Sequence, residues 1–378
     1  MVNGTAQKIS VKQPEEAAPK LKDSIFSHAR IHHIAAETAK VSQSFDHDRF
    51  LAETLAGLDD LTLMERLRHV ANALHAALPM DFPSAVAVLR AVAPRLDSKF
   101  VTLTLSEFVA LYGQDEFDLS MDALRFFTPF GSSEFAVRHF LRRDLQRTLA
   151  VMERWAHDDS PDVRRLASEG SRPRLPWSFR IEPLVRDPSP AAPILEALRA
   201  DPSPYVRKSV ANHLNDITKD NPEWALDRIK GWPREDARVQ WIARHALRSL
   251  VKAGNKDALS LVGASEGVNI RIDDLAISPK EIRAGETLTV SFRITSESEE
   301  RQTIVLDYAI HYVRKNGRTS RKVFKLKTLI LESGHSATLS HRQRIENLSV
   351  RTLYSGQHNV ELLGNGQILG RGSFELQV

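Results

Sequence analysis

The chain of 378 residues is 42% hydrophobic and 26% charged, which is typical of a soluble globular protein with about two or three domains. It contains no cysteine, so a disulfide framework, a thiolate metal site and a cysteine nucleophile are excluded. No apolar run reaches the length of a membrane span, and the polar residues 1–20 lack the apolar core of a secretion signal. We therefore expect a cytoplasmic protein in which residues 1–20 form a polar tail.

The net charge of +4 is unevenly placed along the chain. Residues 268–378 hold 16 Lys and Arg against 12 Asp and Glu, so this segment carries the whole excess and residues 1–267 are neutral overall. A site for a polyanion in the larger part must therefore come from local sorting of charges.

Residues 21–267 are predicted to form one helix after another. Apolar side chains recur at helical spacing, as at Val206, Val210 and Leu214. The segment SPDVRRLA, which begins at Ser160, recurs 43 positions later as SPYVRKSVA from Ser203. A period of about 40 residues with a helix-start signal in each unit predicts an α-solenoid of HEAT-like helical repeats with a concave face. The alternative is an ordinary helical bundle.

Residues 268–378 have the pattern of β-strands. Leu288, Val290, Phe292 and Ile294 alternate with polar residues, as expected of a half-buried strand. Residues 303–313 and 323–331 are also strand-like, and Asn316-Gly317 between them is a hairpin signal. Further turn signals lie at Ser333-Gly334, Ser355-Gly356 and Asn365-Gly366. Roughly seven short strands predict an all-β immunoglobulin-like sandwich that follows the helical domain of residues 21–267.

The densest polar segment of the helical part runs from Arg164 to Trp177. Arg165 and Glu169 are four residues apart and share a helix face. The helix is predicted to end at Gly170, and Arg172 and Trp177 follow in a loop that contains prolines. Arginines around one glutamate and one tryptophan suit contact with phosphate and stacking on a base. The alternative is an ordinary ion pair with a packed tryptophan.

The next repeat has a comparable polar stripe. Lys208, Asn212 and Asp216 lie at steps of four, on a different side of the helix from its apolar stripe. We expect both stripes to line the same concave surface, although a helix of this kind can also expose a merely solvated face. Glu134, at the start of the preceding helix, is a candidate third carboxylate, or simply an acid favoured by the helix dipole.

The sandwich carries a basic hairpin, which comprises Arg314, Lys315, Arg318, Arg321 and Lys322. With Lys325 and Lys327 it gives seven basic residues and no acid between His311 and Thr328. It can neutralise phosphates, or it can keep an edge strand soluble. The sequence has no metal-ligand spacing, phosphate-binding glycine loop or nucleophile elbow, so we expect neither a metal nor a cofactor.

Several long segments resemble the AlkC group of DNA alkylation-repair glycosylases. These are SSEFAVRHFL, VRRLASEGSRPRLPW, YVRKSVANHLNDITKDNP and WIARHALRSLVKAGN, and the similarity extends from LKDSIF near the start to Asn255. The resemblance implies a HEAT-like solenoid that binds duplex DNA on its concave face. Some members of the group also carry a C-terminal immunoglobulin-like domain, which here would assist DNA binding.

The resemblance further implies a monofunctional glycosylase of base excision repair that removes 3-methyladenine and 3-methylcytosine without full base flipping. By motif position, Glu134, Glu169 and Asp216 would be catalytic and Trp177 would lie at the lesion. Arg165 and Arg172 would contact the DNA, and we add Arg164, Arg207, Lys208, Asn212 and the basic hairpin as predicted DNA contacts. Related AlkD proteins rely on one Asp and two Trp, so the division of labour among three acids stays open.

The implied chemistry suits these residue types. N3-methylation gives the base a positive charge, so it leaves as a neutral molecule and no general acid is needed. Carboxylates can stabilise the developing sugar cation and orient a water molecule, and a tryptophan can add a cation–π contact. We expect a monomer in the bacterial cytosol whose partner is double-stranded DNA containing alkylated bases, with no membrane and no obligate protein partner. The alternative is a non-catalytic scaffold that binds DNA or protein.

Overall fold

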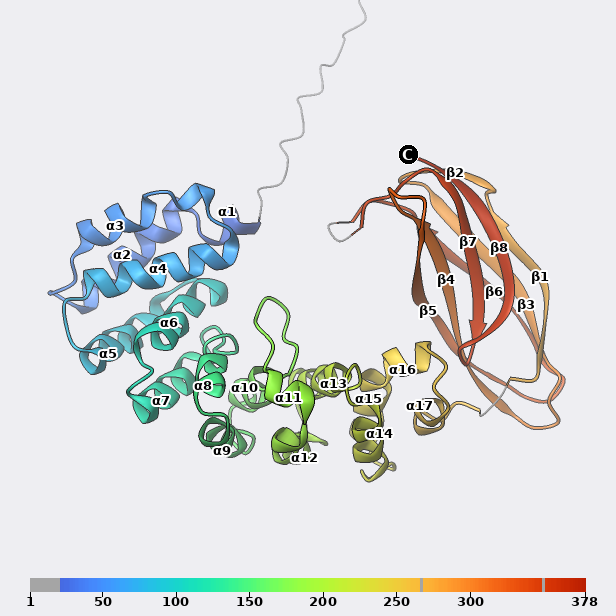
Figure 1. Cartoon of the computed structure of the whole chain (residues 1–378), viewed down its shortest axis with the longest axis horizontal. Helices are drawn as coiled ribbons and strands as arrows, with labels where there is room; N and C mark the ends of the chain where they lie inside the picture. The colour runs from blue at the N-terminus through green and yellow to red at the C-terminus, as the bar shows by residue number, and fades with distance from the viewer. Residues whose placement is uncertain (1–20, 266–267, 349–350) are drawn as a thin grey trace, which may run out of the picture. The chain divides into compact units, whose positions relative to one another are not determined.

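The computed structural model describes residues 21–265, 268–348 and 351–378, so the predicted polar tail lies outside the described residues. The chain divides into two compact units, Met1–Val151 and Met152–Val378, and the boundary falls within helix α9 (Leu145–Trp155). Figure 1 shows the helices and strands in chain order.

The first unit is built on a central helix, α6. Ten consecutive residues of α6, Val101 to Ala110, are buried, because α4, α7 and α8 all pack around it. Helix α2 packs on α3 and α5. The helices are α1 (Leu21–Ile25), α2 (His28–Val41), α3 (His47–Leu55), α4 (Leu63–Ala77), α5 (Phe82–Val92), α6 (Lys99–Tyr112), α7 (Phe117–Phe127) and α8 (Val137–Arg143), with short 3-10 turns at Leu58–Asp60 and Ala93–Arg95.

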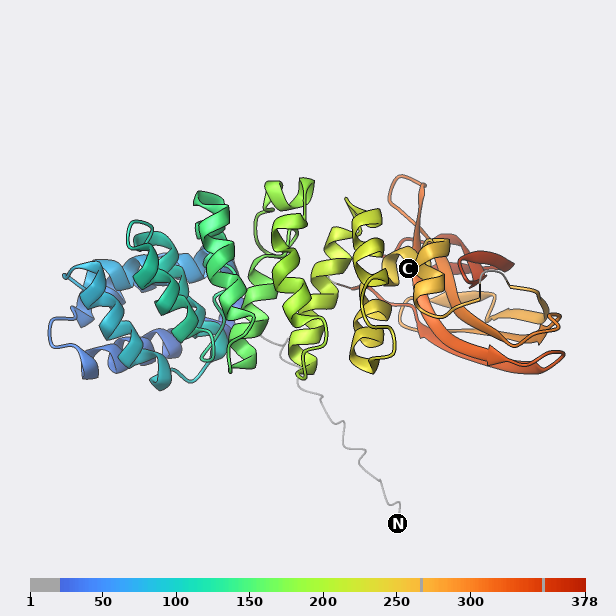
Figure 2. The same ribbon diagram turned by 90° about the horizontal axis from the view of Figure 1, so that it is seen from below.

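The second unit begins with helical repeats. Its helices are α10 (Pro161–Gly170), α11 (Glu182–Arg186), α12 (Ala192–Leu198), α13 (Pro204–Ile217), α14 (Pro222–Lys230), α15 (Ala237–Ala246), α16 (Arg248–Lys252) and α17 (Lys256–Leu261), with a 3-10 turn at Ser189–Ala191. Helices α10, α13 and α15 pack side by side, and α12 contacts both α10 and α13 (Figures 1 and 2). The predicted stack of helical repeats is therefore confirmed, and Val206, Val210 and Leu214 form part of its buried core.

The repeated Ser-Pro signal marks helix starts as predicted, but the capping differs. Ser160 and Ser203 are the N-cap residues of α10 and α13, yet neither hydroxyl caps its helix. Instead, an aspartate two residues earlier accepts a hydrogen bond from each serine N–H, at 2.9 Å for Asp158 and 2.8 Å for Asp201. The repeat signature is thus a turn closed by the side chain of an aspartate, and it begins two residues before the serine.

The arginine in the first turn of each of these helices completes this turn. Arg164 Nη1 donates to the carbonyls of Asp158 and Asp159, and Arg207 Nη1 donates to those of Asp201 and Pro202. Arg164 also forms a bidentate pair with Asp201 of the next repeat, at 2.7 and 3.2 Å. These bonds give Arg164 and Arg207 a structural role within the repeats, and their predicted contact with DNA stays a prediction.

The last part of the chain is a two-sheet sandwich. Its strands are β1 (Ile270–Ser278), β2 (Glu281–Arg283), β3 (Thr287–Ser296), β4 (Gln302–Val313), β5 (Thr319–Leu331), β6 (Ser336–Arg344), β7 (Gly356–Gly364) and β8 (Gln367–Gln377). The sheet orders are β1-β3-β6 and β2-β8-β7-β4-β5. The alternating residues of β3, from Leu288 to Ile294, are buried between the sheets as predicted. The described residues form one strand more than expected, because β2 has only three residues and gives no pattern.

The predicted hairpin between β4 and β5 is also confirmed. Arg314 N–H donates to the carbonyl of Arg318 at 2.8 Å, and Gly317 has φ 73°, which a side chain would make unfavourable. The basic hairpin of the sequence prediction is therefore an extended ribbon that ends in a tight turn.

The sandwich docks on the end of the helical repeats through two glycines. Gly254, after α16, and Gly366, in the β7–β8 turn, approach so closely that a Cβ on Gly366 would lie 2.2 Å from Gly254 Cα. Asn365 Nδ2 donates to the carbonyl of Ser265 at 2.8 Å, and its Oδ1 accepts from Val305 N–H at 2.7 Å. Backbone contact and a bridging amide thus hold this junction together.

Candidate active site

The candidate site forms where the C-terminal ends of α10 and α13 lie side by side. Glu169 is in the last turn of α10 and Asp216 is in the last turn of α13, and both are almost fully buried. A buried carboxylate must find a charged or hydrogen-bonding partner, because burial alone strongly disfavours its ionised form.

Arg172 provides that partner for both acids. Its Nη1 donates to Glu169 Oε1 at 2.6 Å, and its Nε donates to Asp216 Oδ2 at 2.8 Å. Burial lowers the pKa of Arg172, but the carboxylates of Glu169 and Asp216 more than reverse this effect, so the guanidinium stays charged. In the structure the side chain of Arg172 is only 9% exposed and bridges two acids, and its predicted contact with DNA stays a prediction.

The remaining carboxylate oxygens are also bonded. Ser209 Oγ donates to Glu169 Oε2 at 2.6 Å, and Lys219 Nζ donates to Asp216 Oδ1 at 2.8 Å. Arg165 Nη2 lies 3.4 Å from Glu169 Oε1, which agrees with the predicted shared helix face. The side chain of Lys219 is 49% exposed, so the contact of Asp216 with this lysine is its bond closest to solvent.

Trp177 lies in the loop that joins α10 to α11. Its backbone has φ 64°, which is costly for a residue with a side chain, and its side chain is 64% exposed. Arg174 anchors the loop through a bidentate pair with Asp220, at 2.6 Å for both contacts. The ring of Trp177 is thus held at the surface by a strained backbone, where a ligand can reach it. The alternative of a tryptophan packed in the core is therefore wrong.

The polar stripe of α13 runs from exposed to buried along the helix. Lys208 is exposed, Asn212 is half-buried and Asp216 is buried. Asn212 Oδ1 accepts a hydrogen bond from Arg248 Nη2 at 3.2 Å. The stripe thus runs from an exposed lysine to the buried acid. A merely solvated face would be exposed along its whole length.

Glu134 belongs to the first unit. Helix α8 begins at Val137, so Glu134 lies in the turn before the helix and not in its first turn as expected from the sequence. Its Oε2 accepts a hydrogen bond from Ser132 Oγ at 2.8 Å. Its participation in the active site stays a prediction.

Three residues of the site were not found from the sequence: Ser209, Lys219 and Arg248. Ser209 occupies the position held by the buried Leu166 one repeat earlier, so a polar residue at an apolar position was an available signal. Lys219 is three residues beyond Asp216 and was visible as a local ion pair. Arg248 comes from another repeat, and no sequence pattern connects it with Asn212.

The basic hairpin is exposed along its length. Arg321 Nε donates to Glu361 Oε2 at 2.9 Å. Among the described residues, no carboxylate forms an ion pair with Arg314, Lys315, Arg318 or Lys322.

In the part of the chain that the structure describes, no group of three or more His, Asp and Glu is arranged to hold a metal ion. No single described helix is long and apolar enough to cross a bilayer, and α4 and α5 pass that test only as a pair bent by 118°.

The protein is therefore a helical-repeat protein with a buried carboxylate–arginine cluster and an appended immunoglobulin-like sandwich. The chain is 50% identical to the alkylpurine DNA glycosylase AlkC of Pseudomonas fluorescens, solved bound to DNA containing an abasic site analog. That match covers 95% of this chain and 100% of the other, with a TM-score of 0.92.

A second relative, the uncharacterized protein YhaZ of Bacillus subtilis (strain 168), is 38% identical over 350 residues, which is 92% of this chain and 95% of that protein. Residues 271–378 match the family described as the C-terminal Ig-like domain of YhaZ. The chain belongs to the AlkC family.

Replacing Arg172 tests whether it holds the two acids. Arg172→Met leaves Glu169 and Asp216 buried without their shared guanidinium, so the free energy of unfolding should fall by about 3–5 kcal/mol. Because the acids would keep only Ser209, Arg165 and Lys219 as partners, they would bind protons more tightly than in the parent chain, and the loss should shrink as the pH falls from about 8 to about 5. Urea unfolding at several pH values measures both effects.

The matched control is the triple variant Glu169→Gln, Arg172→Met, Asp216→Asn, which buries no charge at these positions. It should regain much of the stability and lose the pH dependence. An Arg172→Met protein as stable as the parent chain, or one whose deficit does not change with pH, would contradict the assignment.

Proposed function

We propose that this protein is a monofunctional DNA glycosylase of base excision repair. It hydrolyses the N-glycosidic bond of cationic alkylated bases, such as 3-methyladenine and 3-methylcytosine, in duplex DNA without full extrusion of the base. The observation that carries the proposal is the pair of buried carboxylates, Glu169 and Asp216, bridged by Arg172. The 50% identity to an alkylpurine DNA glycosylase that binds DNA with an abasic site analog supports it.

The two carboxylates supply the chemistry that this reaction needs. A cationic base leaves as a neutral molecule, so the barrier lies mainly in the positive charge that develops on the sugar. Carboxylates fixed in advance stabilise that charge without reorganising during the reaction, and either can orient the attacking water. Arg172 and Ser209 provide the fixation, because each bonds a different oxygen of Glu169.

Trp177 contributes a flat ring at the surface. Its loop is anchored to Asp220, four residues beyond Asp216, so the ring and the acids are carried by the same repeats. Stacking on a base, or a cation–π contact with a charged one, contributes about 1–3 kcal/mol when the partner is desolvated. The strained φ of Trp177 is consistent with such a fixed position.

The first prediction from this proposal concerns excision. Glu169→Gln and Asp216→Asn should each lower the single-turnover rate of 3-methyladenine release from duplex DNA by about tenfold or more. Glu223→Gln, at an exposed position in the first turn of α14, is the matched control and should be unchanged. In the same assay, Trp177→Ala should be slow and Trp177→Phe should keep most of the rate. If the unaltered protein releases no base at all, the chain is a non-catalytic scaffold.

Lys219 provides a test of charge recognition. Its ammonium occupies the oxygen of Asp216 that Arg172 leaves open, so a cationic base would compete with it for the same carboxylate. Lys219→Met should raise the ratio of affinities for lesion-bearing over undamaged duplex by about two- to fivefold, the value of a half-exposed ion pair. Both affinities include the general attraction of the protein to DNA, so any loss of that attraction in the variant cancels in the ratio.

The control is Lys219→Met combined with Asp216→Asn, which should show no gain in this ratio. A fall in the ratio for Lys219→Met would mean that the lysine assists lesion binding. That result would reject competition at Asp216 and leave the glycosylase activity itself to the excision assay.

The sandwich is proposed to be an accessory DNA-binding domain that acts through its basic hairpin. Each cation that neutralises a phosphate contributes about −0.9 to the slope of log binding constant against log salt. Replacing Arg314, Lys315, Arg318 and Lys322 by alanine should flatten that slope, measured by fluorescence anisotropy. Arg321→Ala should have a smaller effect, because Arg321 is bonded to Glu361. An unchanged slope in the fourfold variant would assign the hairpin to solubility alone.

A further inference from the structure

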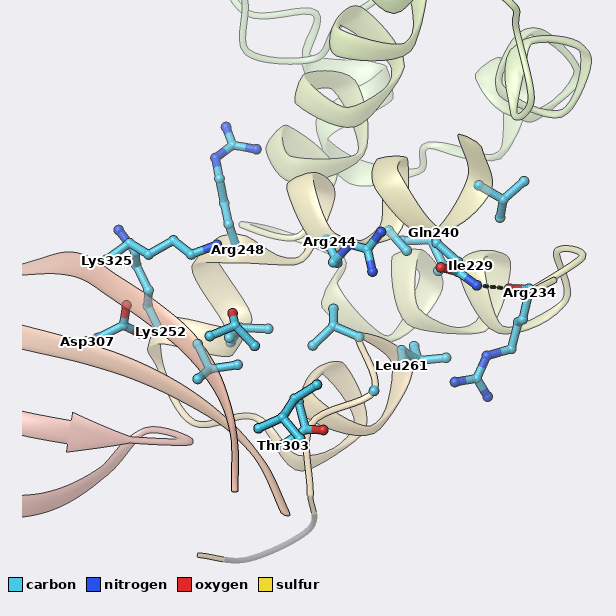
Figure 3. A pocket seen from close by; sticks show the side chains of 18 residues that line it. Ile229, Arg234, Gln240, Arg244, Arg248, Lys252, Leu261, Thr303, Asp307 and Lys325 are labelled. Carbon is cyan, nitrogen blue, oxygen red and sulfur yellow. Dashed lines mark hydrogen bonds between the residues drawn. The ribbon is translucent and has the colours of Figure 1, made fainter. Parts of the chain in front are cut away.

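A cavity of about 560 Å³ lies between the last helices of the repeats and the outer face of β4 and β5 (Figure 3). This volume is in the range of small-molecule sites. Much of its wall is apolar and comes from both sides, with Val239 and Val251 from the helices and Val305 and Ile330 from the sheet. Neither Glu169 nor Asp216 lines the cavity, and it shares only Arg248 with the residues of the candidate active site.

The charges that line the cavity are strongly unbalanced. Five lining residues are cationic and one is acidic: Arg234, Arg244, Arg248, Lys252, Lys325 and Asp307. Among the described residues, none of these cations has a carboxylate oxygen within 4.0 Å. Elsewhere in the same helices arginines do pair with acids, as Arg228 with Glu196 and Arg238 with Asp236. The cations of this cavity therefore differ from their neighbours on α14 and α15, which are paired with acids.

The single acid does little to balance these charges. Asp307 is 2% exposed, and Figure 3 shows it with Lys252 and Lys325 at the sandwich end of the cavity. Burial raises the pKa of Asp307, and the two lysines only partly offset this. Lys252 Nζ donates to the backbone carbonyl of Val323 at 3.2 Å, which is a neutral acceptor. Two ammonium groups beside one carboxyl group leave an excess of positive charge at this end of the cavity, which favours a bound anion.

Arg248 has a similar need. It is half-buried, and its hydrogen bonds go to the carbonyl of His245 and to the amide oxygen of Asn212. Burial lowers the pKa of Arg248; Asp216 opposes this effect and Arg172 adds to it. A half-buried guanidinium with neutral acceptors gains stability from a nearby anion.

We propose that this cavity is a binding site for a nucleotide-sized organic phosphate. Cations without acidic partners recognise the phosphate, and the apolar walls cover the flat, less polar part of the molecule. The uncharged side chains of Gln240, Thr303 and Thr328 offer hydrogen bonds to the edge of a base. A free nucleotide and a nucleotide of a bound DNA strand present the same chemistry.

Isothermal titration of the full chain with adenosine, adenosine monophosphate and adenosine diphosphate tests the proposal. Adenosine should bind weakly, and each phosphate should tighten binding. Arg244→Ala and Lys325→Ala should each weaken the binding of adenosine diphosphate by about tenfold, which is ~1.4 kcal/mol. Both side chains are exposed, so these variants should fold. Lys256→Ala, on α17 but outside the cavity, is the control and should bind as the parent chain does.

Competition with undamaged duplex distinguishes the two sources of the phosphate. If saturating duplex displaces adenosine diphosphate, the site takes a nucleotide of bound DNA, and if both bind together, it takes a free nucleotide. Binding of all three probes that is no tighter than millimolar, or that is the same in Arg244→Ala and Lys325→Ala as in the parent chain, would overturn the proposal. None of these readouts depends on base excision.

Discussion

The arrangement of the site depends on one guanidinium that satisfies two buried carboxylates. Glu169 and Asp216 come from different repeats, and neither would be stable in the protein interior without a cation. Arg172 can bridge them only if α10 ends beside the end of α13, so the electrostatic requirement and the packing of the repeats select the same register. The loop that follows then carries Trp177 away from the core. The chemistry of the site is thus built into the contact between two neighbouring repeats.

The sequence predicted the parts of this arrangement that follow from spacing within one element. The shared face of Arg165 and Glu169 and the stripe from Lys208 to Asp216 are visible in the order of residues, as is the repeat itself. What it did not predict is which residue a side chain meets across two repeats. The bridge that Arg172 forms between Glu169 and Asp216 was not predicted, because an exposed loop arginine and a buried one look alike in sequence. The strained backbone of Trp177 is also set by tertiary contacts, since local preference disfavours it.

Charge is sorted over a short length of the second unit. Around α10 and α13, cations and carboxylates bond one another closely, and the cluster has acids at its centre. Around α15 and α16, cations line a cavity and lack acidic partners. Arg248 is bonded to the stripe of α13 while it lines that cavity, so it belongs to both environments. Two groups of charged residues with opposite local balance thus lie in the same unit, one centred on acids and the other on cations.

The backbone of Trp177 has a consequence for how this protein can change. A left-handed conformation costs a residue with a side chain about 1–2 kcal/mol, and glycine adopts it freely. Glycine at this position would relax the loop but remove the ring. Selection for heat resistance alone would favour that replacement, whereas selection for ligand contact retains the tryptophan. If the proposed contact of Trp177 with the lesion holds, thermal adaptation and activity are in direct conflict at residue 177, and a stabilised form of this protein should be engineered elsewhere.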